Sequence, residues 1–183
     1  MNDPAFVVLS FTLGLLRLTE LRHSRANEMK TGIRRMPGAA ASTYPLMVAL
    51  NVALFTAPLL EPRRARPHRL IAGLLLAVAT ALRVWCIRSL GDQWNVRSAV
   101  PPRLRVVGAG PYRFVRHPNY LAVAIEFCAL PLFGGALRSA VVLSLANAAL
   151  LWHRVAAEEA LLGSSPEYRR IMGGKSRFLP GLL

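Results

Sequence analysis

The stretch Leu70–Leu82 reads LIAGLLLAVATAL and contains no charged residue. The apolar segment around it continues to Leu90 and takes in Arg83 and Arg88. Its length matches the roughly 20 residues that a helix needs to cross a bilayer. Lipid offers the backbone no hydrogen-bonding partner, so such a segment favours a helix over a strand. We therefore predict a membrane-spanning helix over residues 70–90.

Four further apolar segments lie before and after this helix: Pro4–Leu21, Tyr44–Leu60, Tyr120–Leu137 and Ser139–Leu162. The last two are divided only by Gly134-Gly135 and Arg138, which predicts a tight helical hairpin. A further short helix is expected in the tail around Glu167–Arg170. The predicted fold class is an all-α integral membrane protein with about five transmembrane helices, a C-terminal helical hairpin and a short cytoplasmic tail helix.

Composition narrows the class of protein. Of the 183 residues 54% are hydrophobic, and the mean hydropathy is +0.37, yet 23 Lys and Arg against 9 Asp and Glu give a net charge of +14. The basic residues gather between the apolar segments, as in membrane proteins with basic loops, and this argues against a nucleic-acid-binding protein. Cys86 and Cys128 lie in apolar segments with no Cys/His cluster, so we expect no metal site.

The distribution of Lys and Arg predicts the orientation. With five spans, one side holds 15 basic residues, in Arg22–Arg35, Arg97–Arg116 and the tail from Arg154, and the other holds 5, in Arg63–Arg69 and at Arg138. We expect the protein in the bacterial inner membrane. The positive-inside rule then places its N-terminus outside and its C-terminus in the cytoplasm. The 91–117 loop and the tail are expected on the same side.

Two polar clusters could carry chemistry on that side. The stretch Gly110–Tyr120 reads GPYRFVRHPNY and brings cationic or titratable groups to the start of a helix, where burial is costly without a partner. Arg154 and Glu158 lie four residues apart on one face of the last helix, and Glu159 follows. Together the clusters offer donors for a carboxylate, acceptors for an ammonium group and aromatic rings for a sulfonium ion.

At these residues the chain resembles the isoprenylcysteine carboxyl methyltransferase family and the related phospholipid methyltransferases. Their Gly-x-Tyr-x-x-x-Arg-His-Pro-x-Tyr signature corresponds here to Gly110–Tyr120, followed by a hairpin, the Glu158-Glu159 pair and a closing Arg177–Pro180. The match covers roughly residues 80–183. It implies a single domain, residues 1–183, in which residues 1–90 form the first three helices and residues 91–183 the cofactor-binding catalytic core.

The resemblance implies an S-adenosylmethionine-dependent methyltransferase of the EC 2.1.1 type that takes a lipid-like acceptor from the bilayer. The cofactor-binding residues that it implies are Gly110, Tyr112, Arg116, His117, Asn119, Tyr120, Glu158 and Glu159. The residues from Arg83 to Asn95 are similar to bacterial members encoded beside type III polyketide synthases, which methylate the oxygens of alkylpyrones or alkylresorcinols. A prenylcysteine carboxylate and a phospholipid are alternative methyl acceptors.

Catalytic roles are predicted for Arg116, His117, Glu126 and Glu158. A phenol has a pKa near 10 and benefits from a general base, and Glu126, deep in a helix, is a candidate for base or orienting group with Arg83 or Arg88 as its partner. We expect Trp94, Asn95 and Glu126 near the acceptor.

Structural explanations stay open for the same residues. Arg116-His117 could cap a helix and hold Glu158, Glu126 could form a buried ion pair with Arg83, and Trp94 could be an interfacial aromatic. Two alternative functions are a nicotinamide-dependent membrane reductase of related fold and a non-catalytic lipid-binding scaffold. The reductase would need more helices, and a scaffold would not need the convergent charges.

Overall fold

The computed structural model describes residues 3–32, 34–35, 39–62, 67–96, 99–100 and 105–181. Six α-helices carry the fold: α1 (Pro4–Thr31), α2 (Ala39–Leu60), α3 (Arg69–Leu90), α4 (Pro118–Gly134), α5 (Leu137–Leu162) and α6 (Pro166–Met172). Two short 3-10 helices, η1 (Gly91–Gln93) and η2 (Gly110–Arg113), and the two-residue antiparallel strands β1 (Arg34–Arg35) and β2 (Ala99–Val100) complete it. Arg63–Arg66 and most of 97–104, which entered the charge count, lie outside the described residues.

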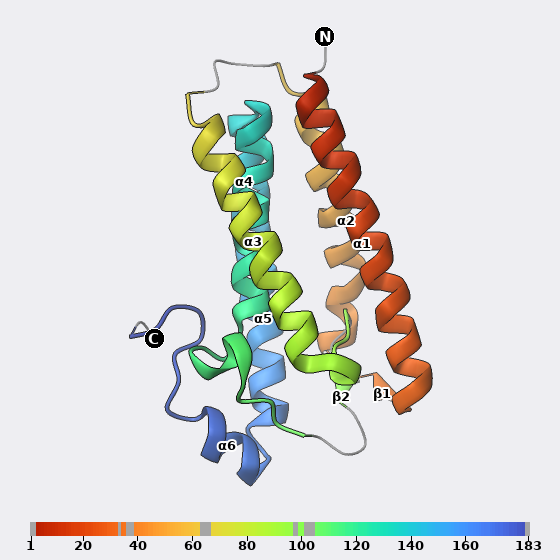
Figure 1. The fold of residues 1–183 in the computed structure, drawn as a ribbon, viewed down its shortest axis with the longest axis vertical. Helices are drawn as coiled ribbons and strands as arrows, with labels where there is room; N and C mark the ends of the chain where they lie inside the picture. Colours follow the sequence, from red (N-terminus) through yellow and green to blue (C-terminus); the bar gives the residue numbers. More distant parts are fainter. Residues whose placement is uncertain are drawn as a thin grey trace.

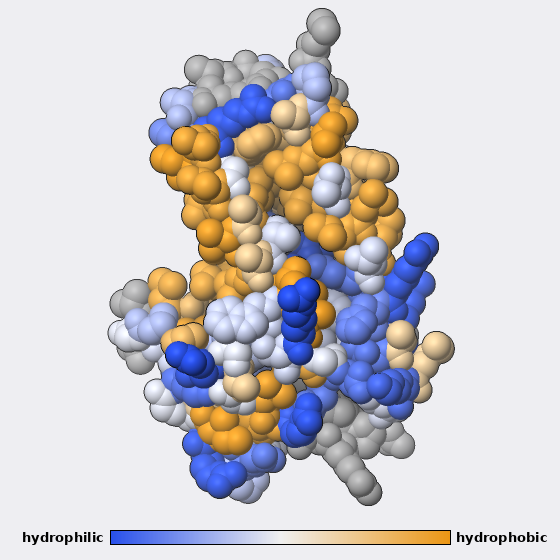
Figure 2. Space-filling model, viewed as in Figure 1, coloured by the Kyte–Doolittle hydropathy of each residue, from blue (hydrophilic) through white to orange (hydrophobic). Residues whose placement is uncertain are grey.

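Four of the described helices, α1, α2, α3 and α5, are long and apolar enough to cross a membrane, and α4 is a shorter apolar helix of 17 residues. Figure 2 shows the corresponding hydrophobic belt over the upper half of one face, with hydrophilic residues gathered below it. The prediction of an all-α membrane protein is thus confirmed.

Helix α4 forms the centre of the bundle, packed mainly against α3 and α5, while α2 packs against α5. Its buried residues include Phe127, Ala129 and Leu130, which join Phe6 of α1 and Leu54 of α2 in the main hydrophobic core. Close packing on both sides explains why the shortest apolar helix is the most enclosed.

The α4–α5 hairpin is as tight as expected. Gly135 adopts φ +79°, a left-handed conformation that ends α4, and its N–H is donated to Leu132 and Pro131 carbonyls. Glu61, just after α2, then caps α5: its carboxylate accepts from the backbone N–H groups of Arg138 (2.9 Å) and Ser139 (2.8 Å). These bonds lower the pKa of Glu61 against an opposing desolvation effect.

Helix α1 runs ten residues beyond the expected end at Leu21. Ser24 and Asn27 in this extension are buried against the turn after α3: Ser24 Oγ lies 3.1 Å from Asn95 Oδ1, and Asn27 Nδ2 donates to the Trp94 carbonyl at 2.8 Å. The polar extension is therefore stabilised by tertiary hydrogen bonds that its composition did not reveal. At this end of the bundle, opposite the N-terminus, lie η1, η2 and α6 (Figure 1).

Candidate active site

The Gly110–Tyr120 stretch is folded around two packing residues. Gly110 has φ +59°, and a Cβ there would lie 2.1 Å from Ser89 Oγ, so only glycine fits between η2 and α3. Tyr112 packs with Cys86 and Met172 in a second core cluster, and burial raises its pKa well above the usual value. Gly110 and Tyr112, both expected at the cofactor, therefore position the loop and do not line the cavity described below.

The C-terminal tail completes the site by pairing with this loop. Val115 and Ser176 form a parallel bridge, and the backbone N–H groups of Arg116 and His117 donate to the carbonyls of Ser176 and Arg177, both at 2.9 Å. Lys175 Nζ donates to the Tyr112 carbonyl at 2.7 Å, and burial lowers the pKa of this amine. The tail thus fixes the backbone from which His117 projects.

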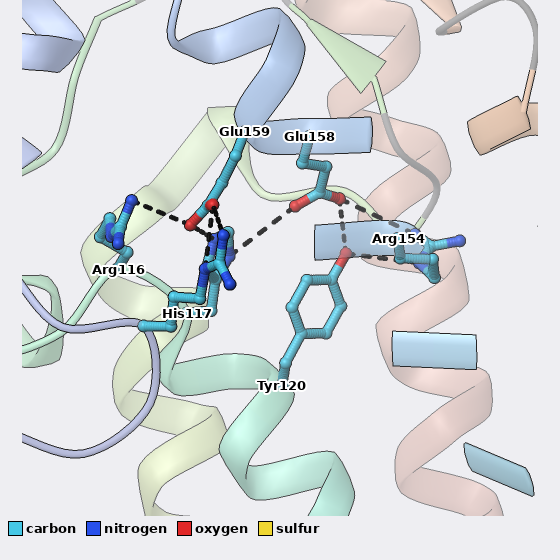
Figure 3. Close-up of polar contacts among 7 residues, drawn as sticks. Arg116, His117, Tyr120, Arg154, Glu158 and Glu159 are labelled. Carbon is cyan, nitrogen blue, oxygen red and sulfur yellow. Dashed lines mark hydrogen bonds and ion pairs between the residues drawn. The ribbon is translucent and has the colours of Figure 1, made fainter. Parts of the chain in front are cut away.

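Three cationic or titratable side chains converge on Glu159 near the end of α5 (Figure 3). Its Oε1 lies 3.1 Å from both Arg116 Nη1 and His117 Nε2, and its Oε2 accepts from Arg177 Nε (3.0 Å) and Nη2 (2.8 Å). Burial lowers the pKa of His117 and outweighs the opposing pull of Glu158 and Glu159. A neutral imidazole at pH 7 follows.

Glu158 belongs to a second group one residue away (Figure 3). The Tyr120 hydroxyl donates to Glu158 Oε1 and accepts from Arg154 Nε at 3.3 Å. Arg154 Nη2 lies 4.0 Å from the same carboxylate, and Arg154 is 2% exposed. Beside them Asn119 Oδ1 is buried without a hydrogen-bond partner within the described part of the chain. Both predicted clusters therefore meet at one end of the bundle.

A cavity of about 790 Å³ begins at this second group and extends into the bundle. Its polar end is lined by Asn119, Tyr120, Arg154 and Glu158, whereas Arg116, His117 and Glu159 lie outside its lining. Its apolar walls come mainly from α1 and α2, and include Phe11, Leu15, Val48, Val52, Phe55 and Leu59. The volume is in the range of sites for drug-sized ligands.

Midway along the cavity lies a group of four charged side chains. Glu126 pairs with Arg17 of α1, Arg17 Nη1 lies 2.6 Å from Glu20 Oε2, and Glu20 binds Arg83 through two bonds of 2.8 Å. Arg83, expected as the electrostatic partner of Glu126, does interact with it electrostatically, but its hydrogen bonds go to Glu20, and the direct ion pair of Glu126 is with Arg17. Arg88, the other expected partner, is exposed.

Sequence reasoning missed Arg17 and Glu20 as part of this site. Two opposite charges three residues apart inside an apolar segment share a helix face, and that signal could have identified them. Trp94 and Asn95, expected near the acceptor, both line the cavity. Trp94 stacks on His23, and Asn95 Nδ2 donates to Glu28 at 3.0 Å.

These features define a polytopic helical membrane protein with a charged pocket inside the bundle. Comparison with known proteins gives the family: the profile of the isoprenylcysteine carboxyl methyltransferase (ICMT) family matches residues 71–164. The uncharacterized protein YpbQ of Bacillus subtilis (strain 168) is 31% identical over 162 residues, covering 86% of this chain and 96% of that protein. The chain belongs to the ICMT family, and membership indicates a membrane methyltransferase; members of the family use S-adenosylmethionine as methyl donor.

Proposed function

We propose that the protein transfers a methyl group from S-adenosylmethionine to an oxygen of a lipid-like acceptor, a long-chain alkylpyrone, an alkylresorcinol or a prenylcysteine carboxylate. The observation that carries this proposal is the cavity that joins the Glu158 end to an apolar compartment between α1 and α2. A polar cofactor and a lipid tail have opposite solvation needs, and one cavity with these two ends meets both. Residues 91–183 would form the cofactor-binding core.

The donor set at the polar end fits the cofactor. Glu158 can hold an ammonium group, Arg154 is a buried cation within reach of a carboxylate, and Asn119 Oδ1 is an unused acceptor. Arg116 and His117 are engaged by Glu159, so in this proposal they position the end of α5 rather than grip the cofactor directly. S-adenosylmethionine would supply a methyl group bound to a sulfonium sulfur, and the neutral thioether released when that bond breaks is a good leaving group for in-line displacement.

The acceptor would lie near Glu126. Its carboxylate can take the proton of a phenol as the oxygen–methyl bond forms, whereas a carboxylate acceptor needs no base. The apolar walls would exclude water and place the lipid chain between α1 and α2. Positioning of the two reactants can supply much of the rate, so no metal is invoked.

The excess of basic residues at the α6 end supports a cytoplasmic active site and C-terminus, with the N-terminus outside, in the bacterial inner membrane. Both the cofactor and the products of a type III polyketide synthase would reach the active site from the cytoplasmic side. The proposed partners are thus membrane lipids, a lipid-like acceptor and such a synthase, with no role for nucleic acid.

The test is turnover of labelled S-adenosylmethionine by the purified protein with alkylresorcinol, alkylpyrone or prenylcysteine acceptors. We expect label in a lipid product, and its loss in Glu158→Gln. Glu126→Gln should slow a phenol far more than a hydroxypyrone, and an equal loss on both would reject the base role. Binding of a nicotinamide cofactor in place of S-adenosylmethionine, or lipid binding that tolerates His117→Ala and Glu158→Gln without any turnover, would overturn the proposal.

A further inference from the structure

Buried polar atoms without a hydrogen-bond partner gather on the cavity wall. Among the described residues eight buried side-chain nitrogen or oxygen atoms lack a partner. Five of them belong to cavity-lining residues: Ser10, Arg83, Trp94, Asn119 and Asn147. Buried polar groups in proteins are nearly always paired, so their concentration at one hollow indicates a ligand that pairs them.

Of these five residues, Asn147 is the one whose burial the site described above explains least. It lies in the middle of α5, is 3% exposed, and its Nδ2 has no hydrogen-bond partner within the described ranges. Neither polar cluster of the sequence contains it. Burying an amide donor in an apolar helix is unfavourable unless something accepts from it.

Asn147 lies at about the same depth as Glu126. It follows the first residue of α5, Leu137, by ten positions, roughly 15 Å along the helix axis, and Glu126 precedes the last residue of α4, Gly134, by eight, roughly 12 Å. Since α4 and α5 form an antiparallel hairpin, both side chains reach the cavity at the level of the four-charge group. The polar end at Tyr120 lies six residues further along α4, roughly 9 Å away.

A second unused donor lies at that level. Arg83 Nε and Nη2 donate hydrogen bonds to Glu20, and its Nη1 is buried without a partner in the residues described. The cavity thus presents the carboxylate of Glu126 together with unsatisfied donors from α3 and α5. A methyl acceptor with a single oxygen could bind at Glu126, but it would leave the amide donor of Asn147 without a hydrogen-bond partner.

We propose that Asn147 is a specificity-determining residue whose Nδ2 donates a hydrogen bond to a second oxygen on the polar head of the methyl acceptor. This inference rests on the proposed methyl transfer and requires an acceptor that carries two oxygens on one head, such as a dihydroxylated ring. Simple monohydric phenols are discriminated against, because they leave the buried donor without a partner.

The experiment compares two probes with the same pentadecyl chain, an alkylresorcinol and the alkylphenol that lacks its second hydroxyl. Wild-type protein is expected to favour the resorcinol. Asn147→Leu should lower kcat/KM for the resorcinol roughly ten-fold and leave the phenol nearly unchanged. Ser144→Ala is the matched control, because Ser144 lies on the same helix, its buried hydroxyl has no hydrogen-bond partner among the described residues, and it does not line the cavity.

Each outcome of this experiment either supports or overturns the inference. Asn147→Leu should keep or raise the melting temperature, because it removes an unsatisfied donor; a lower melting temperature with equal loss on both probes means a structural role and overturns the inference. Wild-type protein that binds S-adenosylmethionine and methylates the alkylphenol as readily as the alkylresorcinol overturns the inference alone. Failure to bind S-adenosylmethionine overturns the proposed function as well.

Discussion

At the residue scale, the site depends on two adjacent glutamates with different surroundings. Glu159 forms ion pairs with Arg116 and Arg177 and a hydrogen bond with the neutral His117, whereas Glu158 accepts a hydrogen bond from Tyr120 and lies near Arg154 at the cavity. Adjacent positions on a helix point about 100° apart, so one carboxylate can join the loop and tail while its neighbour faces the cavity.

Glu159→Gln should destabilise the protein by about 2 kcal/mol, because it weakens charge-assisted hydrogen bonds to Arg177 and His117. Thermal unfolding in detergent measures the loss. Glu167→Gln is the matched control, an exposed glutamate on α6. Equal melting temperatures for the two variants would contradict a structural role for Glu159.

Stability should depend on pH through His117. Burial lowers its folded-state pKa below the ordinary 6.5, so the unfolded chain binds the proton more readily. The contribution of the neutral imidazole is complete above about pH 6.5 and is lost as the pH falls through the window below it. His117→Gln should flatten the melting temperature between about pH 7 and pH 5; an unchanged slope would assign the dependence to another group.

At the scale of elements, α1 is joined to the bundle by apolar packing of Phe6 and Leu13 near its start and by polar contacts further along. Arg17–Glu126 and Glu20–Arg83 hold its middle, and Asn27 holds its far end to the turn after α3. A second hollow of about 290 Å³ lies between α1 and α3 and shares these four charged residues with the main cavity. The charged group therefore fixes a helix that has a hollow on each side.

Arg17→Met should cost about 3 kcal/mol, because it leaves Glu126 without its direct partner in a buried setting. Adding Glu126→Gln should recover part of that loss, so the double variant is less destabilised than the sum of the singles. Unfolding of the three variants in one detergent measures the coupling. Arg22→Met, at an exposed position of the same helix, is the control; strict additivity would mean that the pair is not coupled.

At the scale of the whole molecule, five helices place the two chain ends on opposite sides of the bundle. The active-site end collects η1, η2, α6 and the tail (Figure 1), and it is also the more basic end. With α4 counted as a fifth span beside the four longer described helices, this charge asymmetry predicts the orientation.

Single cysteines test that orientation. With the exposed Cys128 replaced by Ser, Arg138→Cys should react with a membrane-impermeant reagent in intact cells, and Glu167→Cys only after the membrane is opened. Both native residues are exposed, so reactivity reports the side of the membrane. The reverse labelling pattern would place the active site outside.

The sequence by itself determined the apolar helices and the two polar clusters that meet at the site. Long uncharged runs such as Leu70–Leu82 favour helices in lipid, because a helix pairs its own backbone groups, and Gly134-Gly135 between two apolar segments predicts the end of one helix and the start of another. Arg116, His117 and the Glu158-Glu159 pair could be identified because charges at a membrane boundary are costly without a partner.

Only the tertiary structure decided which charges pair and which atoms face the cavity. Glu126 binds Arg17, more than a hundred residues away, and not Arg83, because α1 packs across the bundle at that depth. The extension of α1 to Thr31, and the Asn147 Nδ2 that has no hydrogen-bond partner in the described part of the chain, follow likewise from which helix faces meet. Local pattern fixes the face of a helix, but the neighbour that the face meets is set by packing of the whole chain.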